Sequence, residues 1–230
     1  MLFDLTGRGR RNVVRVIYLG LAILMGAGLL LFGIGTGGEG GLIDAFNGSG
    51  SDTSAQVSSA EKKANRAVRL RPRDPQAWAD LTRARYQTAG LGENYDQATN
   101  AFTEEGREKL VTAATAWKRY LELAPRKPDA TLAQLMANVY SEVGLDVPAE
   151  AASAMEIVTE QRPSAASYGA LAQYAYLADQ MRKGDLAAAK AVQLAPEAQR
   201  RLVRGQLEGA KRQILQRRAE EAMQQSGAGG

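Results

Sequence analysis

The stretch PQAWADLTRARY, residues 75–86, carries a pattern that occurs three times in this chain. A bulky residue, Trp78, is followed three positions later by a leucine and five positions after that by a tyrosine. The same order returns in LAQLMANVY, residues 132–140, and in YGALAQYAY, residues 168–176. Apolar residues recur at helical spacing in all three stretches, so we predict three related α-helices.

A second kind of helical segment alternates with the first and ends at a proline. Small or apolar residues recur at helical spacing in these segments as well, for example at Ala113, Trp117 and Tyr120. Because proline lacks the amide hydrogen that a helix needs and clashes with the preceding turn, each of these helices should stop there. The closing prolines are Pro72, Pro125, Pro163 and Pro196.

Two helices per unit, repeated at a period of about 34 residues, are the sequence pattern of tetratricopeptide repeats. Residues 59–196 resemble such a domain, with one leading half-repeat and three full repeats. The four prolines match the family's closing proline, and Ala60, Ala113 and Ala151 match its small residue where paired helices approach one another.

The chain also departs from the family's pattern. Thr82, Met136 and Ala172 replace the favoured glycine after the first-helix leucine. The first full repeat carries an insertion, residues 90–102, before a second helix that we expect to start near Thr103.

A long helix is expected after the last repeat, at residues 197–224. A stack of repeats needs a terminal cap with a polar outer face, and this helix can supply one. Its arginines and lysines are interleaved with glutamates, so a solvated face is favoured over a basic surface that binds membranes or nucleic acid. Residues 225–230, with three glycines, are expected to be a disordered tail.

The uncharged stretch near the N-terminus, residues 16–38, is typical of a membrane anchor. Residues 16–38 contain no charged side chain, and a helix over the apolar residues 16–34 is about 28 Å long, close to the thickness of a bilayer's hydrocarbon core. We therefore predict a transmembrane helix at 16–35. A cleaved signal peptide is the alternative, but its apolar region is usually only about 7–15 residues long.

The charges beside this span predict its orientation. Residues 1–15 form a basic tail with four arginines, and no lysine or arginine follows the span until Lys62. Positive residues stay on the cytoplasmic side, so we expect a single-pass protein of the cytoplasmic membrane with a cytoplasmic N-terminus and an extracytoplasmic C-terminal domain.

Residues 36–58, rich in glycine and serine, are predicted to be a flexible linker. Gly33-Ile-Gly35-Thr-Gly-Gly38 spells the glycine motif of a dinucleotide-binding turn. That turn works only between a strand and a helix, and here it would follow a membrane helix, so we reject this interpretation.

The chain has 230 residues, no Cys, no His and a net charge of +4. Without Cys or His it cannot form a disulfide, a Cys/His zinc site or a Ser-His-Asp triad. Glu104, Glu105 and Glu108 lie together on one predicted helix, where a solvated face is favoured over paired catalytic carboxylates. We therefore expect a protein that is not an enzyme and that binds no cofactor, no metal and no nucleic acid.

The resemblance implies a groove lined mainly by the first helix of each repeat, where a peptide or helix binds. The motif of chaperone-binding members that clamps a terminal carboxylate is missing here. A floor of alanine and glycine edged by tyrosine suits an apolar helix or strand, although these tyrosines could instead pack between adjacent repeats. The candidate lining residues are Gln76, Ala79, Arg83, Tyr86, Ala133, Ala137, Tyr140, Gly169, Gln173 and Tyr176.

The sequence thus predicts an all-α protein: a transmembrane helix, a flexible linker, a tetratricopeptide-like α-solenoid of about three and a half repeats and a long C-terminal capping helix. The expected function is that of a membrane-anchored scaffold for protein partners, which assists the assembly or folding of secreted or membrane proteins. The alternative is a purely structural or oligomerising membrane protein whose groove is filled by its own C-terminal helix.

Overall fold

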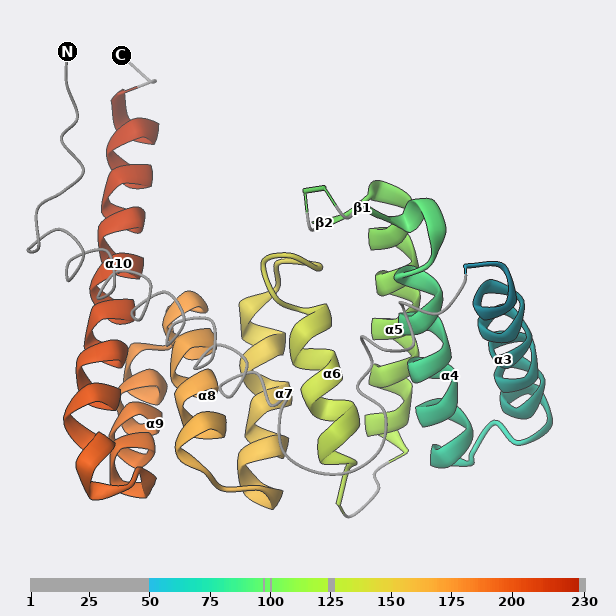
Figure 1. Ribbon diagram of the computed structural model, residues 1–230, viewed down its shortest axis with the longest axis horizontal. Helices are drawn as coiled ribbons and strands as arrows, with labels where there is room; N and C mark the ends of the chain where they lie inside the picture. Colours follow the sequence, from blue (N-terminus) through green and yellow to red (C-terminus); the bar gives the residue numbers. More distant parts are fainter. Residues whose placement is uncertain (1–49, 97, 100, 124–126, 228–230) are drawn as a thin grey trace, which may run out of the picture. The chain divides into compact units, whose positions relative to one another are not determined.

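The computed structural model describes residues 50–96, 98–99, 101–123 and 127–227, and these are mainly helical, which confirms the all-α prediction (Figure 1). The two short strands, β1 (Tyr95–Asp96) and β2 (Ala101–Phe102), pair antiparallel within the predicted insertion. The described α-helices are α3 (Gly50–Leu70), α4 (Pro75–Ala89), α5 (Glu104–Glu122), α6 (Ala130–Val139), α7 (Pro148–Gln161), α8 (Ala165–Leu177), α9 (Met181–Leu194) and α10 (Arg200–Gly227).

The predicted basic tail, residues 1–15, and the predicted membrane span, residues 16–35, lie outside the described residues. Within the part of the chain that is described, no helix is both long enough and apolar enough to cross a bilayer.

The helices begin and end where the local sequence directs them. Asp74, Thr103, Asp129 and Ser164 precede α4, α5, α6 and α8, and each accepts a hydrogen bond from a backbone N–H of the first turn, which stabilises a helix start. Helices α3, α5, α7 and α9 end two or three residues before Pro72, Pro125, Pro163 and Pro196, as predicted.

Three predicted boundaries shift, and one of them is the start of the C-terminal helix, where Glu197–Gln199 form a 3-10 turn and α10 begins at Arg200. Helix α3 begins at Gly50, so residues 50–58, expected to be linker, are helical. At the other end α10 continues to Gly227, three residues beyond its predicted end at position 224. Between them, α5 starts one residue after Thr103, as expected from the sequence.

Consecutive helices pack on one another in the order of the chain (Figure 1). Helices α4 and α5, α6 and α7, and α8 and α9 form three helical hairpins. Helix α3 packs against α4, α7 packs against α8, and α10 packs against both α8 and α9. The contact between α5 and α6 is slight by comparison.

Alanines dominate the contacts between these helices. Ala113 and Ala151 are fully buried, as predicted for the small residues where paired helices meet. Ala60 is exposed, and Ala64, one helical turn later, takes the buried position in α3.

The recurring leucine is buried in two hairpins out of three. From their shared place in the pattern we would expect all three leucines to be core residues; Leu81 and Leu171 are at most 5% exposed, but Leu135 is only half-buried. Leu132 and Met136 fill the core of α6 instead. The buried positions of α6 therefore differ in part from those of α4 and α8.

Truncation to alanine should destabilise the protein more at the buried Leu81 than at the half-buried Leu135. Leu81→Ala should lower the free energy of unfolding by about 2–5 kcal/mol, because it leaves a cavity among Ala64, Ala84 and Ala116. Leu135→Ala should cost less than about 2 kcal/mol, because solvent already reaches that side chain. Denaturant unfolding followed by the fluorescence of Trp78 and Trp117 measures both, and equal losses would contradict the packing described here.

Candidate functional site

The predicted groove residues fall into a buried and an accessible group. Among the buried ones, Ala79, Ala133, Ala137, Tyr140 and Tyr176 are at most 2% exposed, and Gly169 is buried too. The expectation of an accessible alanine and glycine floor edged by tyrosines is therefore wrong for these six residues. Their side chains face neighbouring helices, which is the packing role that the sequence left open for the tyrosines.

The other four residues keep some contact with solvent. Gln76 and Gln173 are exposed, while Arg83 and Tyr86 are half-buried. Gln76 donates a hydrogen bond to Asp80 Oδ1 at 2.8 Å, and Arg83 bonds to both Asp80 and Asp129. On α4, therefore, the accessible polar groups are largely engaged with one another.

Tyr176 is buried because α9 approaches α8 very closely. A side-chain carbon added at Gly184 would collide with the Tyr176 ring. The Tyr176 hydroxyl donates to Asp185 Oδ1 at 2.9 Å, and Lys211 Nζ of α10 donates to the same oxygen at 2.6 Å. The Lys211 ammonium also lies 5.4 Å from the centre of the Tyr176 ring. This cluster joins α8, α9 and α10.

The charges of the cluster follow from these contacts. Hydrogen bonds from Lys211 and Tyr176 lower the pKa of Asp185, so its carboxylate stays ionised. Burial, followed by the bond to Asp185, raises the pKa of Tyr176, so the phenol keeps its proton. The cluster is a set of satisfied partners that fastens three helices together, and it leaves no group free for chemistry.

Tyr140, the counterpart of Tyr176 in α6, has a different environment. Its hydroxyl is buried and makes no hydrogen bond within the described residues. Burial first, and then the nearby Glu150, raise its pKa, so the phenol stays neutral. Tyr140 therefore belongs to the core of α6 and α7 rather than to a binding surface.

Asp129 connects the first hairpin to the second. Its carboxylate accepts hydrogen bonds from the backbone N–H groups of Thr131 and Leu132 at the start of α6, and it pairs with Arg83 of α4. Its own N–H donates to the hydroxyl of Tyr120 in α5 at 2.8 Å. One residue thus bonds to α4, α5 and α6 where α5 and α6 share little direct contact.

Helix α10 is held by its cations. Arg218 pairs with Asp179 and donates to the carbonyl of Leu177 at the end of α8, and Arg217 Nη1 lies 3.6 Å from Glu142 Oε1. Leu207 and Ile214 of α10 are buried in the core shared with the hairpins. This fits a capping helix. Among Leu202, Ile214 and Leu215, the residues of this helix that could fill a groove, only Ile214 is buried, while Leu202 and Leu215 are exposed.

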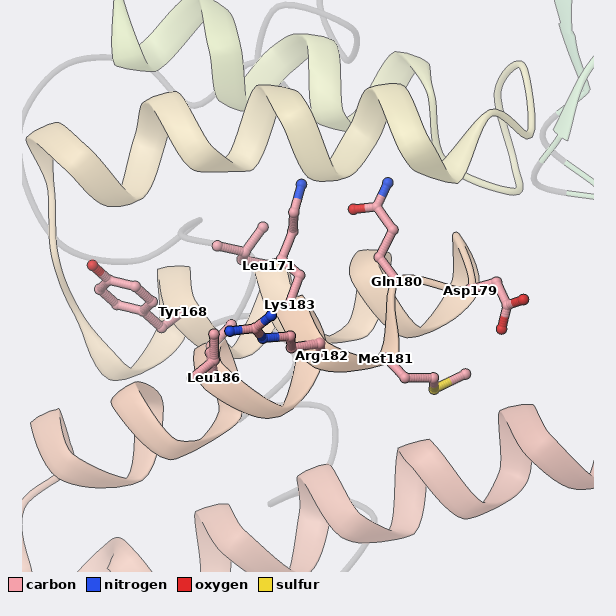
Figure 2. Close-up of a pocket in the computed structure, with 9 residues that line it drawn as sticks. Tyr168, Leu171, Asp179, Gln180, Met181, Arg182, Lys183 and Leu186 are labelled. Carbon is pink, nitrogen blue, oxygen red and sulfur yellow. The ribbon is translucent and has the colours of Figure 1, made fainter.

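An accessible hollow lies along α8 and α9 (Figure 2). It is open to solvent and encloses about 820 Å³. Tyr168 and Leu171 come from α8, Asp179 and Gln180 from the turn, and Met181, Arg182, Lys183, Leu186 and Ala187 from α9.

The hollow combines apolar lining with a few polar groups. Leu186 is 65% exposed and gives the hollow an accessible apolar group. Lys183 reaches α7, where its Nζ lies 2.8 Å from Glu156 Oε1, and Figure 2 shows Gln180 pointing to the same side as Lys183. The side-chain oxygen of Gln180 is buried and accepts no hydrogen bond within the described residues.

Sequence reasoning missed this hollow, although one signal was present. The buried face of α9 consists of Gly184, Ala187 and Ala191, so Leu186 and Leu194 fall outside it. Both are large apolar residues on the solvent side of an amphipathic helix, and Leu186 is the one that lines the hollow.

Nothing in the described part of the chain gathers three acidic side chains into a possible metal site. Glu104, Glu105 and Glu108 are all exposed on α5. No protein-family model matches this chain, and none of the curated proteins matches it significantly.

The close contact at Gly184 can be tested by a single methyl group. Gly184→Ala should lower the free energy of unfolding by about 1–3 kcal/mol, because the new methyl group forces the Tyr176 ring or α9 to move. Gly205→Ala in α10 is the matched control, since nothing lies within 4 Å of its added carbon, and it should raise stability by up to about 1 kcal/mol. Thermal unfolding of both variants checks the sign of each change.

The junction at Asp129 predicts a dependence on pH. Burial alone would raise the pKa of Asp129, but the N–H groups of Leu132 and Thr131, together with Arg83, outweigh it and lower the pKa. A carboxyl group whose pKa is lower in the folded than in the unfolded protein stabilises the fold at any pH above its unfolded-state pKa of about 3.9. This stabilisation is lost as the pH falls through the folded-state pKa.

Denaturant unfolding between about pH 5 and pH 3 tests this expectation. The wild-type protein should lose stability more steeply on acidification than Asp129→Asn, which keeps a helix-capping side chain but cannot ionise. Parallel curves for the two proteins would show that the Asp129 carboxylate contributes nothing through its charge.

Proposed function

We propose that this protein is a membrane-anchored scaffold of the tetratricopeptide type, which binds protein partners outside the cytoplasmic membrane and assists the assembly or folding of secreted or membrane proteins. The observation that carries the proposal is the succession of helical hairpins, joined through small residues, with an accessible apolar hollow on α8 and α9. The uncharged stretch at residues 16–38, preceded by four arginines, supports the anchor and its orientation.

The repeat assignment rests on how regularly the chain alternates. Each hairpin has a first helix that carries the recurring tyrosine near its end and a second helix that stops before a closing proline. Ala113 and Ala151 are buried where the family's small residue is expected. Helix α10 packs on α8 and α9 as a terminal helix would, and its outer face is charged.

The hollow supports a protein partner rather than a small metabolite. It is open, and its apolar side chains can cover one face of a helix or strand. Arg182 is exposed at its edge and makes no ion pair within the described residues, so it can meet an acidic side chain of the partner. The buried oxygen of Gln180 can accept a hydrogen bond from an N–H donor that enters the hollow.

A second candidate is a purely structural or oligomerising membrane protein. The packing of α10 on α8 favours this candidate. A Cβ added at Gly169 of α8 would meet Leu207 of α10, and the Lys211 ammonium of α10 lies over the ring of Tyr176. Under this candidate, the surface that remains accessible binds other copies of the same chain.

Photo-crosslinking in native membranes tests the proposal. A photoreactive residue in place of Leu186, inside the hollow, should capture a distinct partner protein, while the same residue in place of Leu202 on α10 should not. Both leucines are more than half exposed, so accessibility does not explain a difference. Adding Arg182→Glu should reduce the capture at least severalfold by opposing an acidic partner.

Two crosslinking outcomes bear on the candidates, and a labelling experiment tests the location that both share. Equal crosslinking from both positions would contradict a partner site at the hollow, and crosslinks to copies of this chain alone would favour the oligomerising protein.

Cys introduced at Thr6 should be shielded from a membrane-impermeant thiol reagent in intact cells while Cys at Ser51 is labelled, and the reverse pattern would overturn the proposed location.

A further inference from the structure

The side of α3 that faces away from α4 is strongly cationic. Lys62, Lys63, Arg66 and Arg69 are all exposed, and none of them forms an ion pair with another described residue. Lys62, Arg66 and Arg69 follow the i, i+4, i+7 spacing that places side chains along one face of a helix. The opposite side of α3 carries Ala64 and Val68, which pack against α4. We call the four exposed cations the basic face of α3.

The nearby carboxylates do not neutralise this face. Glu61 accepts a hydrogen bond from Thr88 at 2.8 Å and lies 4.0 Å from Arg85, so it is used in the contact with α4. Asp74 caps α4 and pairs with Arg71 at 2.7 Å. The described part of the basic face therefore consists of like charges at i, i+3 and i+4 positions, which repel one another within a helix.

The cations of α10 are of two kinds: Arg201, Arg204 and Arg212 are exposed without an ion pair among the described residues, with Glu208 between them on the same helix, whereas others are paired. Three cations of α10 form ion pairs with other parts of the chain: Lys211 pairs with Asp185, Arg217 with Glu142 and Arg218 with Asp179. The cations of α3 have no such partners within the described residues, so this face can attract negative charge from another molecule.

An apolar side chain lies beside the cations. Leu70, the last residue of α3, is 75% exposed, the highest fraction among the large apolar residues described. A helix that presents lysine and arginine together with an exposed leucine can place the cations among phospholipid headgroups and the leucine against the apolar layer below them. Nucleic acid offers phosphates but no apolar layer for Leu70.

We propose that the basic face of α3 docks on anionic phospholipid headgroups of the membrane that holds the chain, with α3 lying along the surface. This inference rests on the proposed membrane anchor. Residues 36–49 join the predicted span to the first residue of α3 and reach about 50 Å at full extension, which keeps α3 at a high effective concentration near the headgroups. A soluble polyanion has no such tether.

Fluorescence from a single label tests the docking. The chain has no cysteine, so Ser59→Cys, at an exposed position one turn before Lys63, gives a unique site for an environment-sensitive dye on the full-length protein. In phosphatidylcholine vesicles with about one third phosphatidylglycerol, the emission should shift to the blue, and in pure phosphatidylcholine vesicles it should not. Each neutralised cation should lower the ratio of docked to undocked protein about fivefold, and high salt should abolish docking.

Matched variants exclude a general charge effect. Lys62→Gln with Arg66→Gln and Arg69→Gln should lower the ratio about a hundredfold, while Arg201→Gln with Arg204→Gln and Arg212→Gln, which removes the same charge from α10, should leave it unchanged. A label at the exposed Ser153 of α7 should not respond to phosphatidylglycerol.

The remaining outcomes each overturn one proposal. If the protein fails to float with pure phosphatidylcholine vesicles, the proposed anchor is wrong. If it floats but the Ser59 label ignores phosphatidylglycerol, the docking is wrong and the anchor stands. If an oligonucleotide or polyglutamate added to phosphatidylcholine vesicles shifts the label at a lower charge concentration than phosphatidylglycerol does, the basic face binds a soluble polyanion and the lipid proposal fails.

Discussion

The close approach of paired helices, which is possible only where one helix presents alanine or glycine, is the constraint on which the described structure depends. Ala113 and Ala116 on α5, and Ala151 on α7, are completely buried, and Gly184 on α9 admits the ring of Tyr176 at a distance that a methyl group would forbid. Small residues remove little apolar area from water. The stability of each hairpin therefore depends on how well the larger side chains of the facing helix fill the space.

Hydrogen bonds and ion pairs connect one hairpin to the next, and they lie where the helices share few apolar contacts. Asp129 bonds to α4, α5 and α6 at the junction where α5 and α6 share few contacts. At the other end, Lys211 and Arg218 fasten α10 to α8 and α9. These contacts are directional, so they fix how one hairpin meets the next, whereas the alanine contacts fix how tightly the helices of one hairpin pair.

The sequence predicted the helices well because their signals are local. Capping residues such as Asp74 and Ser164 and the closing prolines act within a few positions of themselves. The groove was predicted poorly because burial is decided by residues far away in the chain. The spacing that placed Tyr176 on a helix face could not show that Gly184 lets α9 close over it, or that Lys211 covers the ring from α10.

Leu135 and Leu186 show that the sequence pattern alone does not determine which side chains are buried. Leu135 occupies the position of Leu81 and Leu171 in the repeated pattern but stays half-buried, because Leu132 and Met136 occupy the core of α6. Leu186 was given no role by the pattern and is the most accessible apolar group of the hollow. In both cases the residue lies on a helix, and the packing of that helix against its neighbours decides whether the side chain is buried or accessible.

The two surfaces proposed for binding differ in chemistry and lie on different helices, so one can be occupied while the other is used. The basic face belongs to α3, which packs on α4, and the hollow belongs to α8 and α9. Helices α4 to α7 come between them in the order of packing. Under the two proposals, the basic face attracts an anionic surface through its charge while the hollow selects for shape and apolar area, so lipid would hold the domain near the membrane without competing for the partner's site.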